Sequence, residues 1–231
     1  MKKIFIICIS LFLLLLLILN VEVTYKRGVN YKVSTERIPL LLKISNFYTR
    51  HLNYIHLVNK IVNKSDSFDE KMIKLMTWVQ LNINPQPEEL SVIDDHVWHI
   101  IIRRYGTKDQ YCDVFSTLVN YLGLTSYYNY VYDNENINKY PFVFVLNENK
   151  VYIFDIYNGV YFLKSDNELA SLEYLLTNED WFLKEIKETK LNQKYENFLA
   201  GMQKSGLPKQ NRSMIQSPFR RFIFEIKKLV N

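Results

Sequence analysis

The sequence contains only two cysteines, Cys8 and Cys112, and this scarcity excludes a fold held together by disulfides. Cys8 lies in an apolar N-terminal run, where it could not reach a partner in a folded domain. Cys112 is therefore an isolated thiol in the folded part of the chain. Such a thiol is either a small buried hydrophobe or a nucleophile, so its surroundings in the sequence must decide between the two.

Glycine and proline are scarce as well, with six residues each, whereas 48% of the residues are hydrophobic and 15% are aromatic. This composition excludes a disordered chain and predicts a packed fold. A length of 231 residues suits one domain with a tail. Basic and acidic residues alternate along most of the chain, and the net charge of +5 is mild, so nothing here indicates a nucleic-acid partner.

The N-terminus has the charged and apolar parts of an export signal. Lys2 and Lys3 precede an unbroken apolar run over residues 4–19, and no small residues follow that would form a cleavage site. We therefore predict an uncleaved membrane anchor over residues 1–25, with the rest of the chain on the extracytoplasmic side. Sixteen helical residues span about 24 Å, so Val21, Val23 and Tyr25 are expected to extend the anchor towards a hydrocarbon core of about 30 Å.

Helical periodicity dominates the first half of the remaining chain, and we assign residues 26–66 as a helical connector. Within it, apolar residues recur at helical spacing from Pro39 to Val62. Further helices are predicted for residues 68–84, with Ser67 at the start, and for residues 92–104. Asp109 is expected to cap another helix that carries Cys112 in its first turn and ends at Gly123.

Short β-branched and aromatic runs follow and predict an antiparallel meander. The expected strands are residues 126–132, 142–146, 151–156 and 160–163. Helical periodicity returns from Leu169 to about Met202, and a last helix is predicted after Pro218, so residues 166–231 are assigned as a helical tail with a basic amphipathic end. The expected fold class is α+β, with helices packed on one side of a small antiparallel sheet.

Four segments, in this order, resemble the transglutaminase-like domain of the papain-type cysteine superfamily. Phe68–Val79 is similar to the helix that precedes the active site of that family, and the segment from Tyr105 to Leu124 is similar to its nucleophile helix. Residues 142–145 and 150–155 resemble the paired strands that carry its histidine and aspartate. The resemblance covers residues 68–162, and it implies a core over residues 67–165.

Carried over residue by residue, the resemblance places Cys112 at the nucleophile position and Asp155 at the position of the orienting acid. The base position, fifteen residues before Asp155, holds Tyr140 in place of histidine. A tyrosine, with a pKa of about 10, does not act as a general base at neutral pH, so we expect a degenerate site. Pro141 constrains Tyr140 and predicts an edge strand at the mouth of the cleft.

Each of these residues also has a simpler interpretation. Asp155 could belong to an ordinary turn, and Cys112 could be packing on an apolar helix face. His96 and His99 are the only histidines placed to replace the missing base. Together with Asp95 they also have the spacing of metal ligands, but no second cluster completes a site, so no metal and no cofactor are expected.

The last segment contains a basic amphipathic pattern, in which Arg220, Arg221, Lys227 and Lys228 surround an apolar stripe. It could lie on anionic lipid or dock on its own domain. Our leading hypothesis is a membrane-anchored, catalytically degenerate domain that binds a peptide or protein of the cell envelope. The alternatives are an active cysteine acyltransferase or amidohydrolase that uses Cys112, and a structural component of an envelope assembly.

Overall fold

The computed structural model describes the whole chain except residues 1, 30–31, 94–95, 187–194, 207–222 and 224–231. The predicted helix after Pro218 therefore lies outside the described residues, apart from Ile223. The helices and strands, in chain order, are α1 (Lys2–Leu19), β1 (Glu22–Val29), β2 (Lys32–Pro39), α2 (Leu40–Ile61), α3 (Phe68–Asn82), β3 (Asn84–Pro85), α4 (Val97–Arg103), β4 (Tyr105–Gly106), α5 (Lys108–Tyr121), β5 (Thr125–Tyr132), β6 (Lys139–Asn147), β7 (Lys150–Asp155), β8 (Val160–Leu163), α6 (Leu172–Thr177), β9 (Phe182–Glu185) and α7 (Tyr195–Ser205).

The body of the protein is an α+β fold built on a five-stranded antiparallel sheet with the order β5-β6-β7-β8-β9. The four strands of the predicted meander are present with ends within three residues of the predicted ones. Side chains alternate between the two faces of a strand. In β6, Val143 and Val145 join one hydrophobic core, whereas Phe142 and Phe144 join the other. Both faces of the sheet are therefore apolar and must pack against other elements.

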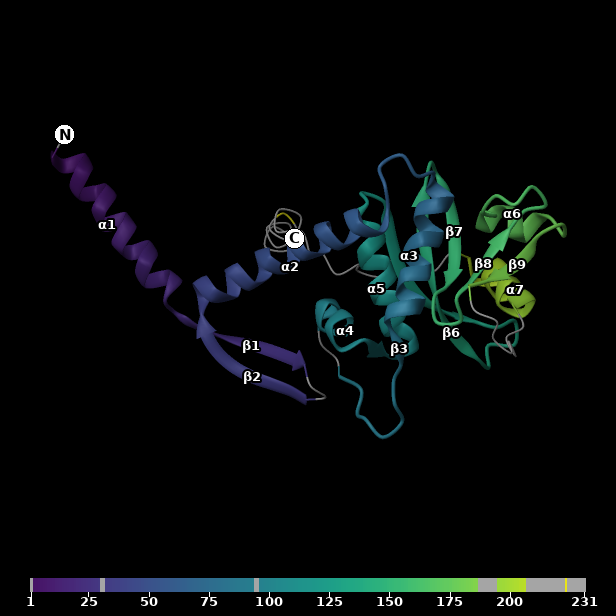
Figure 1. Ribbon diagram of the computed structural model, residues 1–231, viewed down its shortest axis with the longest axis horizontal. Coiled ribbons are helices and arrows are strands. Elements are labelled where there is room, and N and C mark those ends of the chain that lie inside the picture. The colour runs from purple at the N-terminus through teal and green to yellow at the C-terminus, as the bar shows by residue number, and fades with distance from the viewer. Residues whose placement is uncertain (1, 30–31, 94–95, 187–194, 207–222, 224–231) are drawn as a thin grey trace.

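Helices cover both faces, whereas the sequence predicted helices on one side only. α3, α4 and α5 pack on one face around Phe115 and Leu118 of α5, which are fully buried. α6 and α7 pack on the opposite face, where Leu175, Phe198 and Met202 are buried (Figure 1). The prediction was wrong because it overlooked the nearly continuous apolar run over residues 141–146 of β6, which is the pattern of a strand buried on both faces.

The predicted helical tail also differs from the structure. Between α6 and α7 the chain forms β9, which pairs with β8 through the register Leu163↔Phe182 to Val160↔Glu185. α7 then returns across the sheet, so that Gly201 lies against the backbone carbonyl of Tyr132 at the end of β5. Residues 166–186 and 195–205 are thus part of the body. The transglutaminase-like core over residues 67–165 was implied by the family resemblance, and its C-terminal limit remains a prediction.

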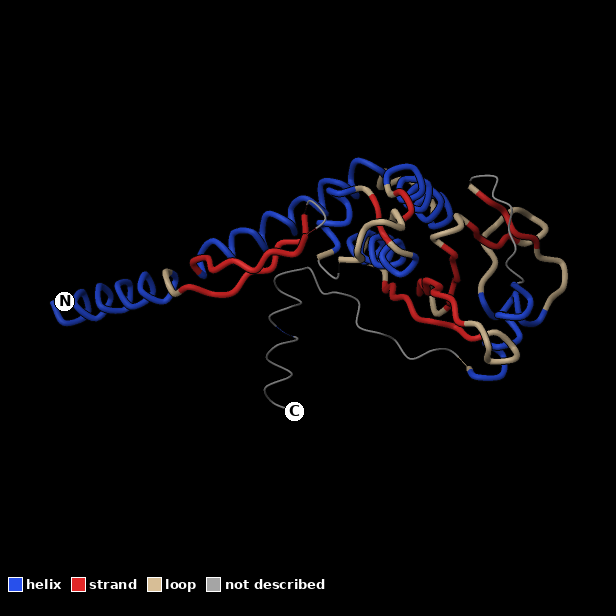
Figure 2. The backbone as a smooth tube through the Cα atoms, turned by 90° about the horizontal axis from the view of Figure 1, so that it is seen from below, coloured by secondary structure: helices blue, strands red, loops and turns tan. Residues whose placement is uncertain are grey.

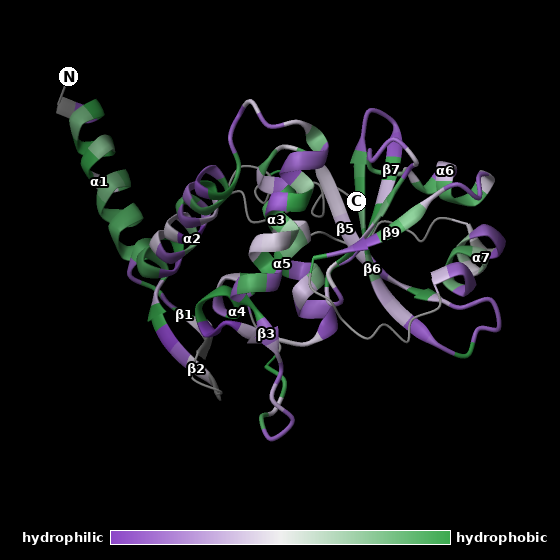
Figure 3. Cartoon of the chain, turned by 45° about the vertical axis from the view of Figure 1, so that its right-hand side comes forward, coloured by the Kyte–Doolittle hydropathy of each residue, from purple (hydrophilic) through white to green (hydrophobic). Residues whose placement is uncertain are grey.

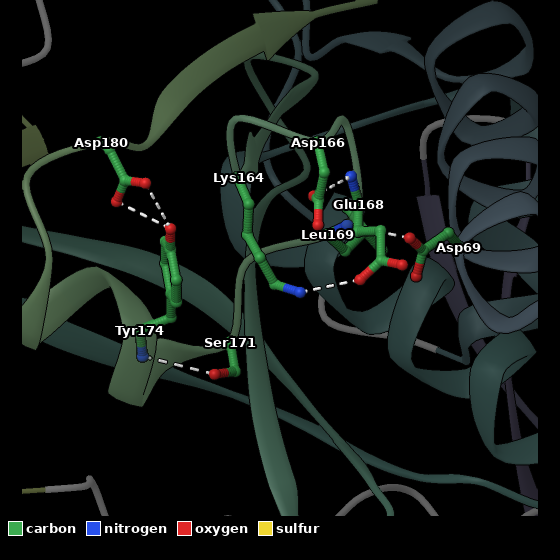
Figure 4. A network of polar contacts seen from close by, with 8 residues as sticks. All are labelled: Asp69, Lys164, Asp166, Glu168, Leu169, Ser171, Tyr174 and Asp180. Atoms are coloured by element: carbon green, nitrogen blue, oxygen red, sulfur yellow. Dashed lines mark hydrogen bonds and ion pairs between the residues drawn. The ribbon is translucent and has the colours of Figure 1, made fainter.

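The loop that leads from β8 to α6 is fastened by polar contacts, shown in Figure 4. The backbone N–H of Leu169 donates to Asp69 Oδ2 at 2.8 Å, which links this loop to the first turn of α3. Lys164 pairs with Glu168 at 2.8 Å, and the hydroxyl of Tyr174 lies 2.7 Å from Asp180. These contacts hold α6 over the second face of the sheet.

The N-terminal part projects from the body as a stalk made of α1, the β1–β2 hairpin and α2 (Figure 2). α1 is apolar around its whole circumference in Figure 3, and its described side chains from Ile4 to Ile18 are exposed. Among the helices in the described part of the chain, none is both long enough and apolar enough to cross a membrane. β1 and β2, which cover residues 22–29 and 32–39, pair as antiparallel strands, and this corrects the prediction of a helical connector over residues 26–66.

The hairpin also corrects the predicted extension of the anchor. Val23 and Tyr25 belong to β1, and they pair with Ile38 and Glu36 of β2 instead of continuing α1. Residues that are β-branched or aromatic at alternating positions favour this extended conformation. The helix predicted from Pro39 to Val62 is confirmed as α2.

Two helices near the site, α3 and α5, both begin with a capping box, but only the start of α3 falls where the sequence predicted it. Ser67 and Glu70 form the reciprocal capping box at the start of α3, as the sequence predicted. α5 begins earlier than expected, because Thr107 and not Asp109 is its N-cap and the Thr107 N–H donates to Gln110 Oε1 at 3.1 Å. Gly123 has φ +85 and takes the left-handed conformation after α5, as predicted.

Candidate active site

Cys112 lies on the sheet-facing side of α5 and is fully buried, with 0% of its surface exposed. Its Sγ lies 3.8 Å from the carbonyl oxygen of Pro141 on β6. Because α5 starts at Lys108, Cys112 is one turn inside the helix, and the prediction that it occupies the first turn was wrong. The free N–H groups of a helix N-terminus are confined to its first turn, so their effect on this thiol is reduced.

Tyr140 and Asp155 lie at neighbouring ends of β6 and β7, which pair in the register Val143↔Phe154. Both side chains point to the face of the sheet that α6 and α7 cover, and the Tyr140 hydroxyl lies 3.3 Å from Asp155 Oδ1. The structure therefore brings these two predicted site residues together. Cys112 approaches the same strand end from the opposite face, through its contact with Pro141.

Pro141 is not on an edge strand, as the sequence predicted, because β6 lies between β5 and β7. Although proline has no N–H to donate to a neighbouring strand, no hydrogen bond between strands need be lost here. In this half of β6, Tyr140 and Pro141 pair with Val131 and Tyr130 of β5, whereas the pairing with β7 begins only at Val143. A proline is tolerated where one side of the strand has no ladder partner.

Two residues that the sequence analysis missed complete the surroundings of Asp155. The hydroxyl of Tyr195, on α7, donates to Asp155 Oδ2 at 2.7 Å. Asn158 donates its backbone N–H to Asp155 Oδ1 at 3.0 Å and its side-chain amide to Oδ2 at 2.7 Å. The same amide lies 3.0 Å from the Tyr140 hydroxyl. The turn Asp155–Gly159 was recognised as turn chemistry, but nothing local could reveal Tyr195, which is 40 residues away.

A third missed residue, Gln80 of α3, fixes the turn after β7. Its side chain is buried and donates to the carbonyl oxygens of Ile156 and, at 3.1 Å, Tyr157. Gly159, with φ +71, leaves the room that this amide needs. The turn that carries Asn158 is thereby held against α3, which keeps the donors of Asp155 in place.

Burial sets the protonation of the thiol. Desolvation raises the pKa of Cys112 well above its ordinary value, and the nearby carboxylates of Asp155, Asp113 and Asp109 raise it further. At neutral pH the thiol is therefore protonated, which is the unreactive form. An activated nucleophile would need a cation or a base beside it, whereas the charged groups that shift this pKa most are carboxylates.

Burial also raises the pKa of Asp155, while the hydrogen bonds from Asn158, Tyr195 and Tyr140 oppose that shift. The pKa of Tyr140 is raised by desolvation first and then by the negative charge of Asp155, and the pKa of Tyr195 is raised for the same reasons. Both phenols are thus hydrogen-bond donors across the physiological range. Neither can accept a proton from Cys112.

Aromatic side chains surround Tyr140, which occupies the predicted base position. Tyr140 is only 6% exposed, and its ring packs against Phe142 and Phe198 with centroids 5.5 and 6.2 Å apart. The ammonium group of Lys108, in the first turn of α5, lies 4.9 Å from the centre of the Tyr140 ring. Tyr140 and Asp155 are thus part of a packed interior on one face of the sheet, and Cys112 is buried on the other face.

His96 and His99 lie at the start of α4 with ring centres 6.1 Å apart, and His99 is buried. Asp95, their possible partner, lies outside the described residues. Among the residues that the structure does describe, no three His, Cys, Asp or Glu side chains lie close enough together to hold a metal ion.

Two cavities, each of about 620 Å³, lie away from Cys112. One is formed by α6, β9 and α7 and is lined by Trp181, Phe182 and Leu199 together with Glu179 and Glu196. The other lies between α2 and α3, beside Trp78 and Leu81. The first is the more relevant to function because it borders β9, an edge strand of the sheet.

No protein-family model matches the sequence. No curated protein matches it. Among solved structures, a candidate protease from Parabacteroides distasonis ATCC 8503 is 12% identical with a TM-score of 0.37, and the match covers 58% of this chain and 35% of that chain. A protein described as a TGase is also 12% identical, with a TM-score of 0.38, over 58% of this chain and 43% of that chain. The chain therefore spans less than half the length of either neighbour.

Proposed function

We propose that this protein is a membrane-anchored domain of the transglutaminase-like type that has lost catalysis and acts by binding a peptide or protein. The observation that carries the proposal is the hydrogen bond between Tyr140 and Asp155 beside a fully buried Cys112. In an active triad the orienting acid holds a histidine base, and the base activates the thiol. Here the acid holds a phenol.

Support for the family assignment comes from the order of the elements. The segment that resembles the helix before the active site forms α3, and the one that resembles the nucleophile helix forms α5. The two segments that resemble the paired strands form β6 and β7, which are neighbours in the sheet. Each similarity found in the sequence thus falls on an element of the expected type.

Support for the loss of catalysis comes from protonation and access. The pKa of Cys112 is raised, and Tyr140 has no accessible proton-accepting state near neutral pH. A carbonyl substrate would also have to reach a sulfur atom that has no exposed surface. Desolvation, aromatic packing and negative charge all act against a thiolate at this position.

Anchoring through α1 is supported by its composition and exposure. The helix is 18 residues long, its only charges are Lys2 and Lys3, and its apolar side chains are exposed. Burying that surface in lipid is strongly favourable. At 1.5 Å per residue the helix spans about 27 Å, which is shorter than a hydrocarbon core of about 30 Å, so the proposal requires the bilayer to thin locally by about 3 Å. We propose that the body lies on the extracytoplasmic side.

A peptide partner would find its best-formed site at the cavity between α6, β9 and α7. Within the described residues β9 pairs only with β8, and Phe182 and Leu183 are exposed beside the cavity. An extended peptide can add to such an edge and place alternate side chains in a neighbouring pocket. A structural role in an envelope assembly would use the same surface without a defined peptide.

A transamidation and amide-hydrolysis assay on the detergent-solubilised full chain tests the proposal. With a glutamine-containing peptide and a fluorescent primary amine, we expect the wild type and Cys112→Ala to give the same background signal. Product that depends on Cys112 would overturn the proposal and establish the alternative, an active cysteine acyltransferase or amidohydrolase.

A further inference from the structure

One face of α2 carries a row of large apolar side chains that the described part of the chain leaves exposed. This row, the α2 stripe, consists of Leu41, Ile44, Tyr48, Leu52 and Ile55. Successive members are three or four residues apart, and at about 100° per residue they fall within an arc of about 80°. Leu52 is 61% exposed and Tyr48 is 51% exposed, so the stripe is not the packing face of the helix.

The packing face of α2 points elsewhere. Tyr54 and Val58 are buried, and the Tyr54 ring stacks on Tyr121 of α5 with centroids 5.0 Å apart. Nearer its start, Lys43 donates to the carbonyl oxygen of Thr24 at 2.9 Å, which fixes the helix to the hairpin. With its inner face occupied by α5 and the hairpin, α2 presents the stripe outwards as a continuous apolar strip.

The start of the stripe is fixed next to the end of α1. The backbone N–H of Leu40 donates to the carbonyl oxygen of Val21 at 2.9 Å, and Glu22 pairs with Pro39. From this point α2 leaves at a wide angle to α1, so that it runs across the axis of α1 instead of continuing it (Figure 1). If α1 is inserted along the membrane normal, α2 runs along the membrane surface.

The charge around the stripe favours an anionic surface. Residues 20–63, which include the hairpin and α2, contain seven Lys or Arg residues and two Glu residues, a balance of +5 that equals the net charge of the whole chain. α2 itself contains no acidic residue. An apolar stripe on a helix within such a basic segment favours binding in the plane of an anionic membrane interface.

The same charges disfavour a second copy of the chain as the occupant of the stripe. Two α2 helices packed along their stripes would bring two basic segments together, with no acidic side chain on either helix to form an interhelical salt bridge. Anionic lipid headgroups neutralise that charge, and acyl chains accept the apolar side chains.

We infer that the α2 stripe lies in the interface of an anionic lipid bilayer and forms a second membrane contact beside α1. The inference rests on the proposed anchoring by α1, which brings the start of α2 to the bilayer surface. The two contacts would fix the orientation of the body relative to the membrane. A single membrane helix followed by a free linker would allow the body to rotate above the membrane surface.

Depth measurements on the full chain test this inference. The environment-sensitive fluorophore NBD is attached to single introduced cysteines, Leu52→Cys in the stripe and Phe12→Cys in α1, in a Cys8→Ser background. Asn134→Cys, in the exposed turn between β5 and β6, is the matched control, and the background without an added cysteine reports any labelling of Cys112. Proteins are reconstituted in phosphatidylcholine vesicles with and without phosphatidylserine, and with lipids that carry a spin label on the acyl chain.

We expect the fluorophore at position 52 to show a blue-shifted emission and quenching by spin-labelled lipid, with stronger quenching when phosphatidylserine is present. Position 134 should show neither change. Quenching at position 12 without quenching at position 52 would overturn the inference while leaving the anchor intact. A blue shift at position 52 without lipid quenching, accompanied by disulfide cross-linking between Leu52→Cys copies, would also overturn it and identify a dimer interface. Absence of quenching at position 12 would contradict the anchor separately.

Discussion

The Tyr140 hydroxyl lies 3.3 Å from Oδ1 of Asp155, a carboxylate that also receives hydrogen bonds from Tyr195 and Asn158. Burial would make an unpaired carboxylate at this position very costly. Asp155 is therefore a structural centre that joins β6, the turn after β7 and α7.

The first prediction concerns the hydrogen bond from α7. Tyr195→Phe removes the hydroxyl that donates to Asp155 at 2.7 Å and leaves the buried carboxylate short of a donor. We expect it to lower the free energy of unfolding by about 1–3 kcal/mol, measured by urea denaturation followed through tryptophan fluorescence. Tyr174→Phe is the matched control, because its hydroxyl also meets a carboxylate, Asp180, but at the exposed surface (Figure 4). Equal losses in the two variants would contradict a special role for the buried contact.

The second prediction uses the raised pKa of Asp155. Between the ordinary pKa of a carboxyl group and its raised value in the fold, the folded state binds more protons than the unfolded state, so stability falls as pH rises. Asp155→Asn removes this titration. We expect the stability of the variant relative to the wild type to increase through that window, by at most about 1.4 kcal/mol per pH unit, and to level off above it. Parallel stability curves from acid to neutral pH would show that Asp155 is not perturbed.

The third prediction tests the packing of α7 on the sheet. A Cβ at Gly201 would overlap the backbone carbonyl oxygen of Tyr132, which cannot move without shifting the end of β5. Gly201→Ala should therefore lower the free energy of unfolding by about 1–3 kcal/mol despite its better helix propensity. Asn197→Ala, at an exposed position of the same helix, should have little effect. A neutral Gly201→Ala would mean that α7 does not approach β5.

Local patterns in the sequence predicted the elements that position the site. Alternating β-branched and aromatic residues predicted the strands β5 to β8, and Ser67 with Glu70 predicted the start of α3. The family resemblance implied that Tyr140 and Asp155 lie on paired strands, and their side chains meet in the structure.

Long-range relationships could not be predicted in the same way. Tyr195 is one of many tyrosines in the chain, and only the folding of α7 back across the sheet brings it to Asp155. The pairing of β1 with β2 was missed because the residues before Pro39 were assigned together with the helix that follows them. Packing of Cys112 on an apolar helix face was one of two interpretations that the sequence left open. The sequence did not decide between them, because the N-cap was expected at Asp109, two residues after Thr107, which placed the thiol in the first turn, where it is more easily ionised.

The fourth prediction restores the missing base. Tyr140→His would place an imidazole beside Asp155, which favours the imidazolium and supplies a positive charge near the thiol. We expect the pH midpoint for alkylation of Cys112 to fall in this variant and not in Tyr140→Phe, which removes the hydroxyl without adding a base. An equal midpoint in the two variants would show that position 140 is not the base position.

The most direct test of the central claim is the rate of iodoacetamide alkylation of Cys112 against pH, in the full chain with Cys8→Ser. The burial of Cys112 and the carboxylates around it predict a slow reaction with a midpoint above that of a free thiol, about 8.5. Alkylation after unfolding in urea should show the ordinary midpoint and serves as the internal control. A midpoint below about 7.5 in the folded protein, the range of activated cysteines, would contradict the account of an inactive site.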